Sequence, residues 1–232
     1  MSAVRYVLVA VMATAGTLGA CADDDTAGTA DRGEPVSTTT TVPVFTLEQL
    51  AAAMPTEADL PDGYGITDSC LTPEDPDCLQ DTRYPYVSVA ADNSGGSSID
   101  EFFAVTATMP PNADAAADQQ ASSRTEAGRE DGAFDFPVEE SEDGSYTPGR
   151  RGEGRLEDAE IDGWTGYRLV SSYESTHPDG TTDPPAMDGT LVLTKGNVVL
   201  TVQVDMHAGE TPDDTPEARL DTWMRSVITK LA

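Results

Sequence analysis

Acid–base or nucleophilic catalysis requires a histidine, carboxylate or thiol held beside a second polar group. The sequence contains two histidines. His177 stands in the turn-forming stretch Thr-His-Pro-Asp-Gly, and His207 closes a predicted strand. Neither has the surrounding residues of a catalytic triad, so we expect both to be solvent-exposed loop residues. An enzymatic site, the least favoured alternative, would be sought at His207 with Asp205 or Asp221.

Other catalytic and binding motifs are absent from the sequence. It contains no Gly-x-Ser-x-Gly elbow, no Ser-x-x-Lys pair, no Walker A loop and no dinucleotide-binding fingerprint. Asp179, Asp183 and Asp188 do not have the spacing of a calcium-binding loop. We therefore expect no catalytic residues, no cofactor and no metal site beyond a weak cation contact.

Cys21 points to a different chemistry, which is lipid attachment. Arg5 precedes an uncharged apolar run at residues 6–18, which is too short to span a hydrocarbon layer of about 30 Å. The run ends in Leu18-Gly19-Ala20-Cys21, which resembles the lipobox of bacterial lipoproteins. The resemblance implies that residues 1–20 are a signal peptide and that Cys21 receives a diacylglyceryl group. The alternative is an ordinary secretory leader that contains a cysteine.

The net charge indicates how the protein would contact a membrane. Lys and Arg number 13 and Asp and Glu number 42, which gives a net charge of −29. Such a chain lacks the positive surface that nucleic acids require, and anionic headgroups would repel it. Each methylene buried in lipid contributes about 0.8 kcal/mol, so two acyl chains on Cys21 would hold the protein firmly. We expect a lipid-anchored protein on the extracytoplasmic face of the cell membrane, with no nucleic-acid partner.

Cys70 and Cys78 are the two remaining cysteines. An exported protein meets an oxidising environment, in which a pair of thiols forms a disulfide. Closing this short loop would contribute about 2.5 kcal/mol in the chain-entropy model. A zinc site is the alternative, but the gap between the two cysteines does not have zinc spacing and no histidine lies near them in the sequence. We expect a disulfide between Cys70 and Cys78.

The composition divides the mature chain into two parts. Residues 21–44 are rich in Thr, Asp and Pro, so we expect a lipidated cysteine followed by a flexible tether. Residues 45–232 are long enough for one domain with an ordinary hydrophobic core. Within this domain, residues 131–153 are rich in Gly, Glu, Asp and Arg. We expect a mobile excursion there, with Phe134 and Phe136 as anchor points.

Local patterns predict helices and antiparallel strands in this domain. Thr46 and Gln49 have the spacing of a capping box for a short helix, and Asn112 is placed to cap a helix that ends near residue 128. A third helix should begin at Thr215 and Pro216, because apolar residues then recur at three- and four-residue spacing. The predicted strands comprise residues 84–91, 101–109, 164–173, 190–194 and 198–205. We predict a single α+β domain with an antiparallel sheet, packed by the C-terminal amphipathic helix and at least one other helix.

Three segments carry a resemblance to a known group of proteins. They are Leu-Pro-Asp-Gly-Tyr at 60–64, Lys-Gly-Asn-Val-Val-Leu-Thr-Val at 195–202, and the closing helix from Trp223 to Leu231. With the lipobox and tether, they resemble actinobacterial surface lipoproteins that carry a sensor-like or PsbP/Mog1-like α+β ectodomain. The resemblance implies the fold but supplies no catalytic residue.

These observations favour one function over two alternatives. The first hypothesis is a non-enzymatic binding or sensor-like module, whose ligand or envelope partner is unknown. A carrier of an apolar molecule is the second, and it requires a cavity between the sheet and the helices. An enzyme of unknown type is the third, and it requires convergent polar residues in a cleft.

Overall fold

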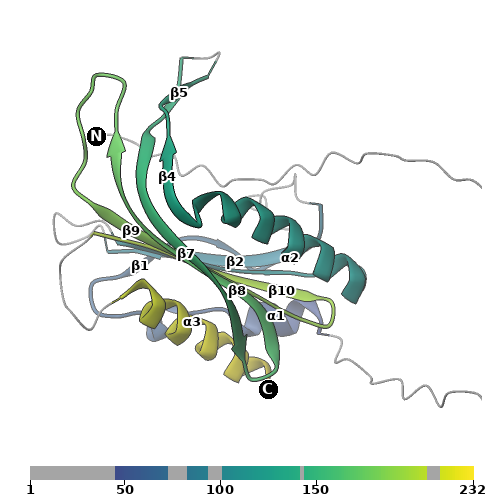
Figure 1. Cartoon of the computed structure of the whole chain (residues 1–232). Coiled ribbons are helices and arrows are strands. Elements are labelled where there is room, and N and C mark those ends of the chain that lie inside the picture. Colours follow the sequence, from purple (N-terminus) through teal and green to yellow (C-terminus); the bar gives the residue numbers. More distant parts are fainter. Residues whose placement is uncertain (1–44, 73–82, 94–100, 142–143, 208–214) are drawn as a thin grey trace, which may run out of the picture. The chain divides into compact units, whose positions relative to one another are not determined.

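The structure is a computed structural model that describes residues 45–72, 83–93, 101–141, 144–207 and 215–232 (Figure 1). The signal peptide, the lipid site at Cys21 and the tether, all predicted for residues 1–44, lie outside the described residues, as does Cys78. The predictions about them therefore stay predictions. In the described part of the chain, no helix is both long and apolar enough to cross a membrane.

The described residues form an eight-stranded antiparallel sheet in the order β1-β2-β3-β10-β9-β8-β7-β4. Two short strands, β5 and β6, pair separately. The sheet confirms the predicted α+β class. The strand bounds are β1 Gly65–Cys70, β2 Tyr86–Asp92, β3 Phe102–Thr108, β4 Gly132–Phe136, β5 Glu139–Glu140, β6 Tyr146–Thr147, β7 Gly149–Ile161, β8 Trp164–Thr176, β9 Ala186–Lys195 and β10 Val198–His207.

The three α-helices begin at the caps that the sequence predicts. Thr46 and Gln49 form a complete capping box at the start of α1. Asn112 caps α2, and Thr215 caps α3, which has a proline in its first turn. These side chains satisfy backbone N–H groups that have no partner within the helix. The helix bounds are α1 Leu47–Ala53, α2 Ala113–Ala127 and α3 Pro216–Leu231, with short 3-10 helices at η1 Glu57–Asp59 and η2 Gly128–Glu130.

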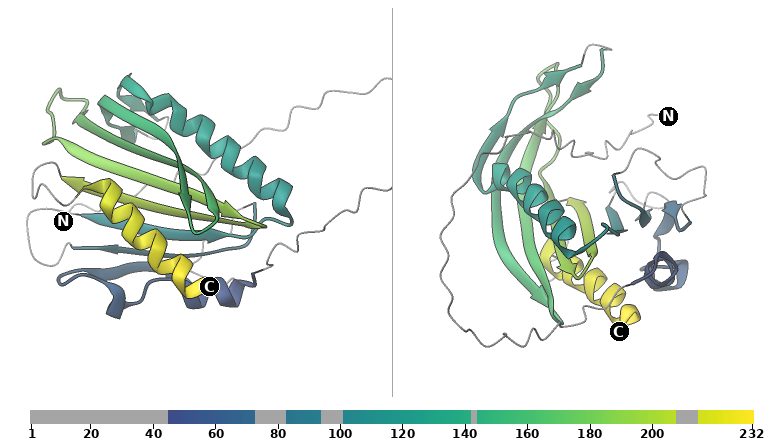
Figure 2. Two further views of the ribbon diagram at one scale, coloured as in Figure 1. Left: turned by 60° about the horizontal axis from the view of Figure 1, so that its bottom comes forward. Right: turned by 90° about the vertical axis from the view of Figure 1, so that its right-hand side faces the viewer.

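The helices cover opposite faces of the sheet. Successive residues of a strand point to opposite faces. Leu191 and Leu193 belong to the large core that includes residues of α1 and α3, whereas Val192 between them packs in a smaller core with Ala116 of α2. The two faces are called the α3 face and the α2 face below. Figure 2 shows α3 and α2 with the curved strands β7 and β8.

The large core lies on the α3 face. Alternate residues of β10 are buried there from Val198 to Val204, as the period-two pattern predicts. The predicted apolar stripe of α3 packs against them, and the ring of Trp223 stacks on Phe103 with centroids 4.1 Å apart. Leu50 of α1 and Leu220 of α3 are fully buried in the same core. Burial of this apolar surface is the main favourable contribution to folding.

The prediction of a mobile excursion at residues 131–153 is wrong for both ends of that segment, which form strands. β4 pairs with the first residues of β7, from Phe136 opposite Arg150 to Gly132 opposite Gly154. Both strands join the main sheet at its edge. Composition misled the prediction because both faces of this part of the sheet carry charged residues and glycines. Phe134 is buried and Phe136 half-buried, and their rings stack with centroids 5.2 Å apart, in line with the predicted anchor points.

Candidate functional site

The candidate site lies on the long strands β7 and β8, where the first residues of β7 pair with the last residues of β8. Each has 13 residues. Figure 1 shows that β4 and the neighbouring parts of β7 and β8 rise beyond the C-terminal end of α2. We call β4, residues 149–154 of β7 and residues 171–176 of β8 the sheet extension. Since helix α2 ends below it, other contacts must hold the extension in shape.

A cluster of polar groups on the α2 face supplies such contacts. Arg150 of β7 lies 3.2 Å from Glu130 of η2 and 2.6 Å from Asp188 of β9. Ser171 of β8 hydrogen-bonds both carboxylates, with its hydroxyl 3.1 Å from Glu130. The ring of Tyr173 lies under the guanidinium, 3.8 Å from ring centroid to Cζ. We call these five residues the Arg150 cluster.

The cluster is largely removed from solvent. The side chains of Arg150, Glu130 and Asp188 are 25%, 19% and 29% exposed, and Ser171 is buried. Burial raises the pKa of Asp188 above its usual range, and Arg150 partly offsets this. Burial, with the nearby carboxylates of Asp205 and Asp188, also raises the pKa of Tyr173. The tyrosine therefore stays a neutral hydroxyl at physiological pH, and the single guanidinium of Arg150 is shared by the two carboxylates.

Two glycines of β7 make room for the cluster. A side chain at Gly154 would overlap the carbonyl oxygen of Glu130, and one at Gly152 would overlap the backbone of Ser172. Glycine therefore allows η2 to lie directly on β7 and β7 to approach β8 closely. The close approach of η2 brings the carboxylate of Glu130 within reach of Arg150.

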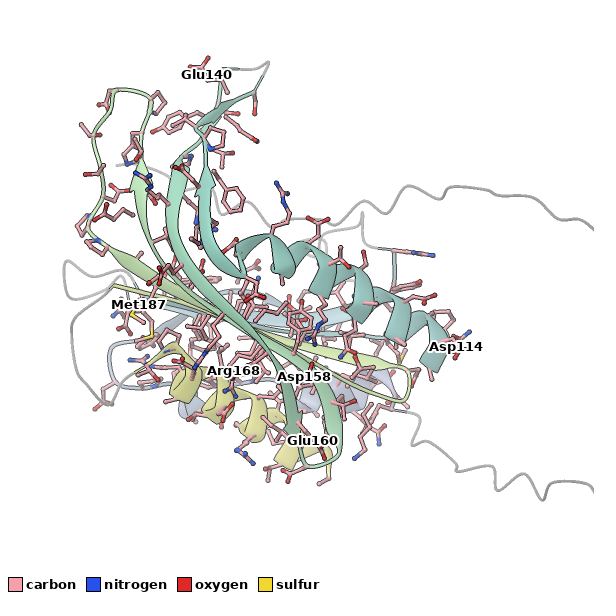
Figure 3. All side chains as sticks on the ribbon, viewed as in Figure 1. Asp114, Glu140, Asp158, Glu160, Arg168 and Met187 are labelled. Carbon is pink, nitrogen blue, oxygen red and sulfur yellow. The ribbon has the colours of Figure 1, made fainter. Side chains whose placement is uncertain are left out.

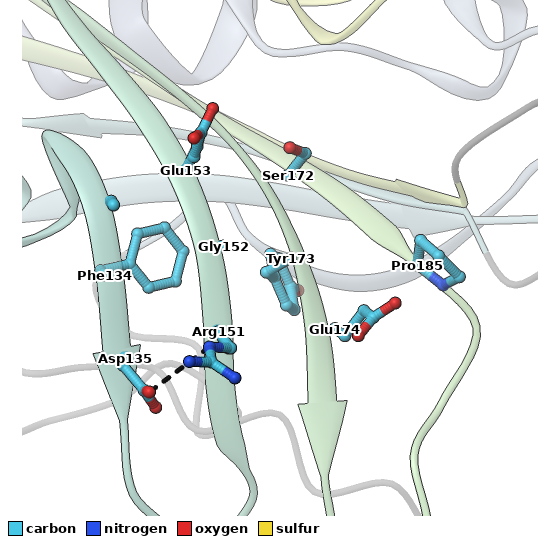
Figure 4. A pocket seen from close by; sticks show the side chains of 10 residues that line it. Phe134, Asp135, Arg151, Gly152, Glu153, Ser172, Tyr173, Glu174 and Pro185 are labelled. Carbon is cyan, nitrogen blue, oxygen red and sulfur yellow. Dashed lines mark ion pairs between the residues drawn. The ribbon is translucent and has the colours of Figure 1, made fainter.

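A groove of about 520 Å³ crosses strands β4, β7 and β8 (Figure 4). Residues directly opposite in an antiparallel pair share a face. Arg155 of β7 pairs with Glu217 of α3 at 2.9 Å, so Arg151 and Glu153, at even spacing from it, lie on the α3 face. The lining residues are Ala133, Phe134, Asp135, Arg151, Gly152, Glu153, Ser172, Tyr173, Glu174 and Pro185.

The groove has two walls and a floor. Cross-strand pairing places Ala133, Glu153 and Ser172 in one row, and Asp135, Arg151 and Glu174 in the other. Figure 4 shows these rows on either side of Phe134, Gly152 and Tyr173. The rings of the floor residues Phe134 and Tyr173 contact Arg150, so the Arg150 cluster lies directly behind the groove.

Acidic side chains are otherwise spread over the described surface. Exposed examples on three elements are Asp114 of α2, Glu140 of β5, and Asp158 and Glu160 of β7 (Figure 3). Arg168, also labelled there, pairs on the α3 face with Glu157 at 3.3 Å and with Asp221 of α3. Among the described residues, no three His, Cys, Asp or Glu side chains gather as a metal site would require.

A second cluster joins α3 to the start of β3. Arg219 donates to the Tyr64 hydroxyl at 2.8 Å and lies 3.1 Å from the carboxylate of Glu101, which is 7% exposed. The Tyr64 hydroxyl also donates to Glu101. Burial first, and then the bond to Glu101, raises the pKa of Tyr64 to about 12. These residues fasten the N-terminal part of α3 to the sheet and are not among those that line the groove.

The predicted candidates for enzymatic chemistry lie apart. Asp221 pairs with Arg168 on the α3 face, whereas Asp205 lies opposite Asp188 and therefore on the α2 face. His207 ends β10, and its side chain lies outside the described part. The sheet thus separates the two carboxylates proposed for His207.

His177 differs from its prediction. Its Nε2 lies 2.9 Å from Asp183, and its Nδ1 lies 3.3 Å from the hydroxyl of Tyr146. It therefore ties the β8–β9 loop to the β5–β6 hairpin instead of standing free in solvent. Asp179 accepts from Thr181 within the same turn, so the three aspartates considered for a cation have separate partners.

Cys70 ends β1 and is buried, while Cys78 lies outside the described residues, so the disulfide stays a prediction. Tight packing of Trp223 on Phe103, with Leu220 and Met224 fully buried beside them, gives no support to an apolar cavity under α3. A second hollow of about 200 Å³, near Trp164 and Lys195, lies at the other end of β8.

The Arg150 cluster and the groove were missed by the sequence analysis. One signal was available in the alternation along β7, where Arg150, Gly152 and Gly154 share one face and Arg151 and Glu153 the other. Such alternation indicates a strand with two different faces.

No protein-family model matches the chain, and no curated protein matches it either.

Proposed function

We propose that this chain is a lipid-anchored protein of the extracytoplasmic membrane face whose domain binds a ligand or an envelope protein without catalysis. The groove on the sheet extension is the observation that carries the proposal. The Arg150 cluster lies directly behind it. Because burying charges is costly, placing them behind the groove supports a role in keeping its shape.

The chemistry of the groove suits binding. Its volume of about 520 Å³ falls in the usual range of ligand sites. Its walls offer carboxylates, the guanidinium of Arg151 and the hydroxyl of Ser172, and no histidine is among the lining residues. These groups can recognise a polar partner through hydrogen bonds and ion pairs. Pro185 and Ala133 add apolar contact at the two ends.

Site-specific photo-crosslinking in intact cells tests this proposal. A benzophenone amino acid would replace Ser172, which is exposed in the groove, and in a second strain Asp118, which is exposed on α2. We expect a discrete, saturable adduct in the membrane fraction from position 172 alone. Equal adduct patterns at both positions, or none at either, would contradict binding through the groove.

A further inference from the structure

We propose that the Arg150 cluster is a buried proton-binding site, in which Asp188 holds a proton on Oδ1 and donates it to Ser171, while Ser171 donates its own to Glu130. This inference goes beyond the proposed function and does not depend on what occupies the groove. It is carried by the number of hydrogen atoms that the contacts of Ser171 require and by the charges gathered around Arg150.

The contacts of Ser171 require one hydrogen more than its hydroxyl carries. Its Oγ lies within hydrogen-bond distance of Oε2 of Glu130, at 3.1 Å, and of Oδ1 of Asp188. A serine hydroxyl donates one hydrogen, and an ionised carboxylate can only accept. Ser171 is 1% exposed, so bulk water cannot reach it to supply a second donor. Both hydrogen bonds therefore form only if one of the two carboxyl groups is protonated and donates to Oγ.

The contacts of Arg150 place that proton on Asp188. Both oxygens of Glu130 accept from the guanidinium, Oε1 at 3.2 Å and Oε2 at 3.4 Å. Asp188 accepts from the guanidinium through Oδ2, at 2.6 Å, and directs Oδ1 to Ser171. Oδ1 can therefore carry a proton without the loss of a bond to Arg150. The donors then run from Asp188 through Ser171 to Glu130.

The charges around Asp188 favour the same state. Arg150 of β7 is the one guanidinium of the cluster, and Tyr173 of β8 is neutral, whereas Glu130 of η2 is an acid. Asp205 of β10, a further acid, lies directly opposite Asp188. Burial raises the pKa of Asp188 above its usual range, Arg150 opposes this, and the charge of Glu130 adds to it. With Asp188 protonated, the cluster sets one carboxylate against one guanidinium.

Loss of the proton would weaken the support behind the groove. Ser171 would then donate to one carboxylate alone, and the ionised Asp188 would face Glu130 and Asp205 in a poorly solvated place. The contacts concerned join β8 to η2 and to β9. We therefore expect the sheet extension to be held most firmly at pH values below the pKa of folded Asp188.

Carbon-13 NMR of the full-length chain in nonionic detergent, labelled at the aspartate carboxyl carbons, tests the inference. One resonance should titrate with a midpoint above the ordinary aspartate value of 3.8, and Asp188→Asn should remove it. Asp135→Asn is the matched control and should keep it, because Asp135 is 68% exposed and pairs with Arg151. Persistence of that resonance in Asp188→Asn would overturn the inference. So would a wild-type spectrum without any such resonance, which decides the question even if the variant fails to fold.

Urea unfolding at a series of pH values gives a second readout. The pKa of Asp188 is raised in the folded protein, so folding disfavours its ionised form. This destabilisation is present above the raised pKa and is relieved as the pH falls through it toward 3.8. The amide of Asp188→Asn can donate to Ser171 at every pH, so the variant should unfold at higher urea than the wild type at neutral pH.

The difference between the two proteins should disappear on acidification. The ratio of their unfolding constants should shrink by up to about ten-fold per pH unit, as the uptake of one proton requires. A parallel pH dependence of wild type and Asp188→Asn would overturn the inference. Loss of the dependence in Glu130→Gln alone would also overturn it, because the proton would then belong to Glu130.

Discussion

Arg150 shows how a single charged residue can connect several elements where no hydrophobic core is available. It reaches Glu130 from η2 and Asp188 from β9, and its guanidinium covers the ring of Tyr173. Each of these contacts compensates part of the cost of burying a charge. Its two carboxylate partners lie 20 and 38 residues from it in the sequence, and only the pairing of the strands brings them together, so residue spacing alone could not predict the cluster.

Replacing Arg150 tests this interpretation. We expect Arg150→Met to lower the free energy of unfolding by about 2–3 kcal/mol, because Asp188 and Glu130 lose their partner in a poorly solvated place. Arg155→Met is the matched control, since Arg155 is 63% exposed and pairs with Glu217; its loss should cost less than about 1 kcal/mol. Urea unfolding measures both. Similar losses for the two variants would show that the cluster has no special role.

The Tyr64 hydroxyl predicts a defined pH dependence. Its pKa in the folded protein, about 12, lies above the unfolded value of about 10. The neutral form is therefore favoured by folding, and its contribution is fully present below pH 10 and lost as the pH rises toward 12. In a phenolate absorbance titration, Tyr64→Phe should remove a component with a midpoint near 12. Removal of a component near 10 instead would contradict the buried contact with Glu101.

At the scale of elements, the predictions succeeded where local chemistry decides the structure. The caps at Thr46, Asn112 and Thr215 were predicted because a capping side chain acts within three residues. β4 and β7 were missed because their pairing partners, and not their own composition, make them strands. The groove depends on this pairing and could not be predicted without it.

The packing of α3 on β9 gives a prediction at this scale. A side chain at Gly189 would lie 2.8 Å from Cδ1 of Leu220 and 3.2 Å from Cβ of Pro216. Gly189→Ala should therefore push α3 away from the sheet and cost about 1–3 kcal/mol. Gly65→Ala is the control, because no atom lies within 4 Å of the added carbon. Thermal and urea unfolding compare them, and an equal cost would mean that the contact is not tight.

At the scale of the whole molecule, charge and attachment have to be considered together. The net charge of −29 opposes contact with anionic lipid, so in our proposal the lipid on Cys21 holds the protein at the membrane. In the same proposal, residues 21–44 connect the lipid to the domain that carries the groove. The fold class could be predicted from the sequence, since periodic apolar residues determine it. The binding surface could not, since it depends on how β4, β7 and β8 pair and on the face to which each side chain then points.

The most direct test of the account is the mass of the mature N-terminus. The native protein would be extracted from membranes, digested and analysed by mass spectrometry, with a Cys21→Ser variant as control. We predict an N-terminal peptide that begins at Cys21 and carries a diacylglyceryl group, and release of the variant from the lipid-anchored fraction. A native peptide that begins before Cys21, or an unmodified Cys21 in the membrane fraction, would contradict the account.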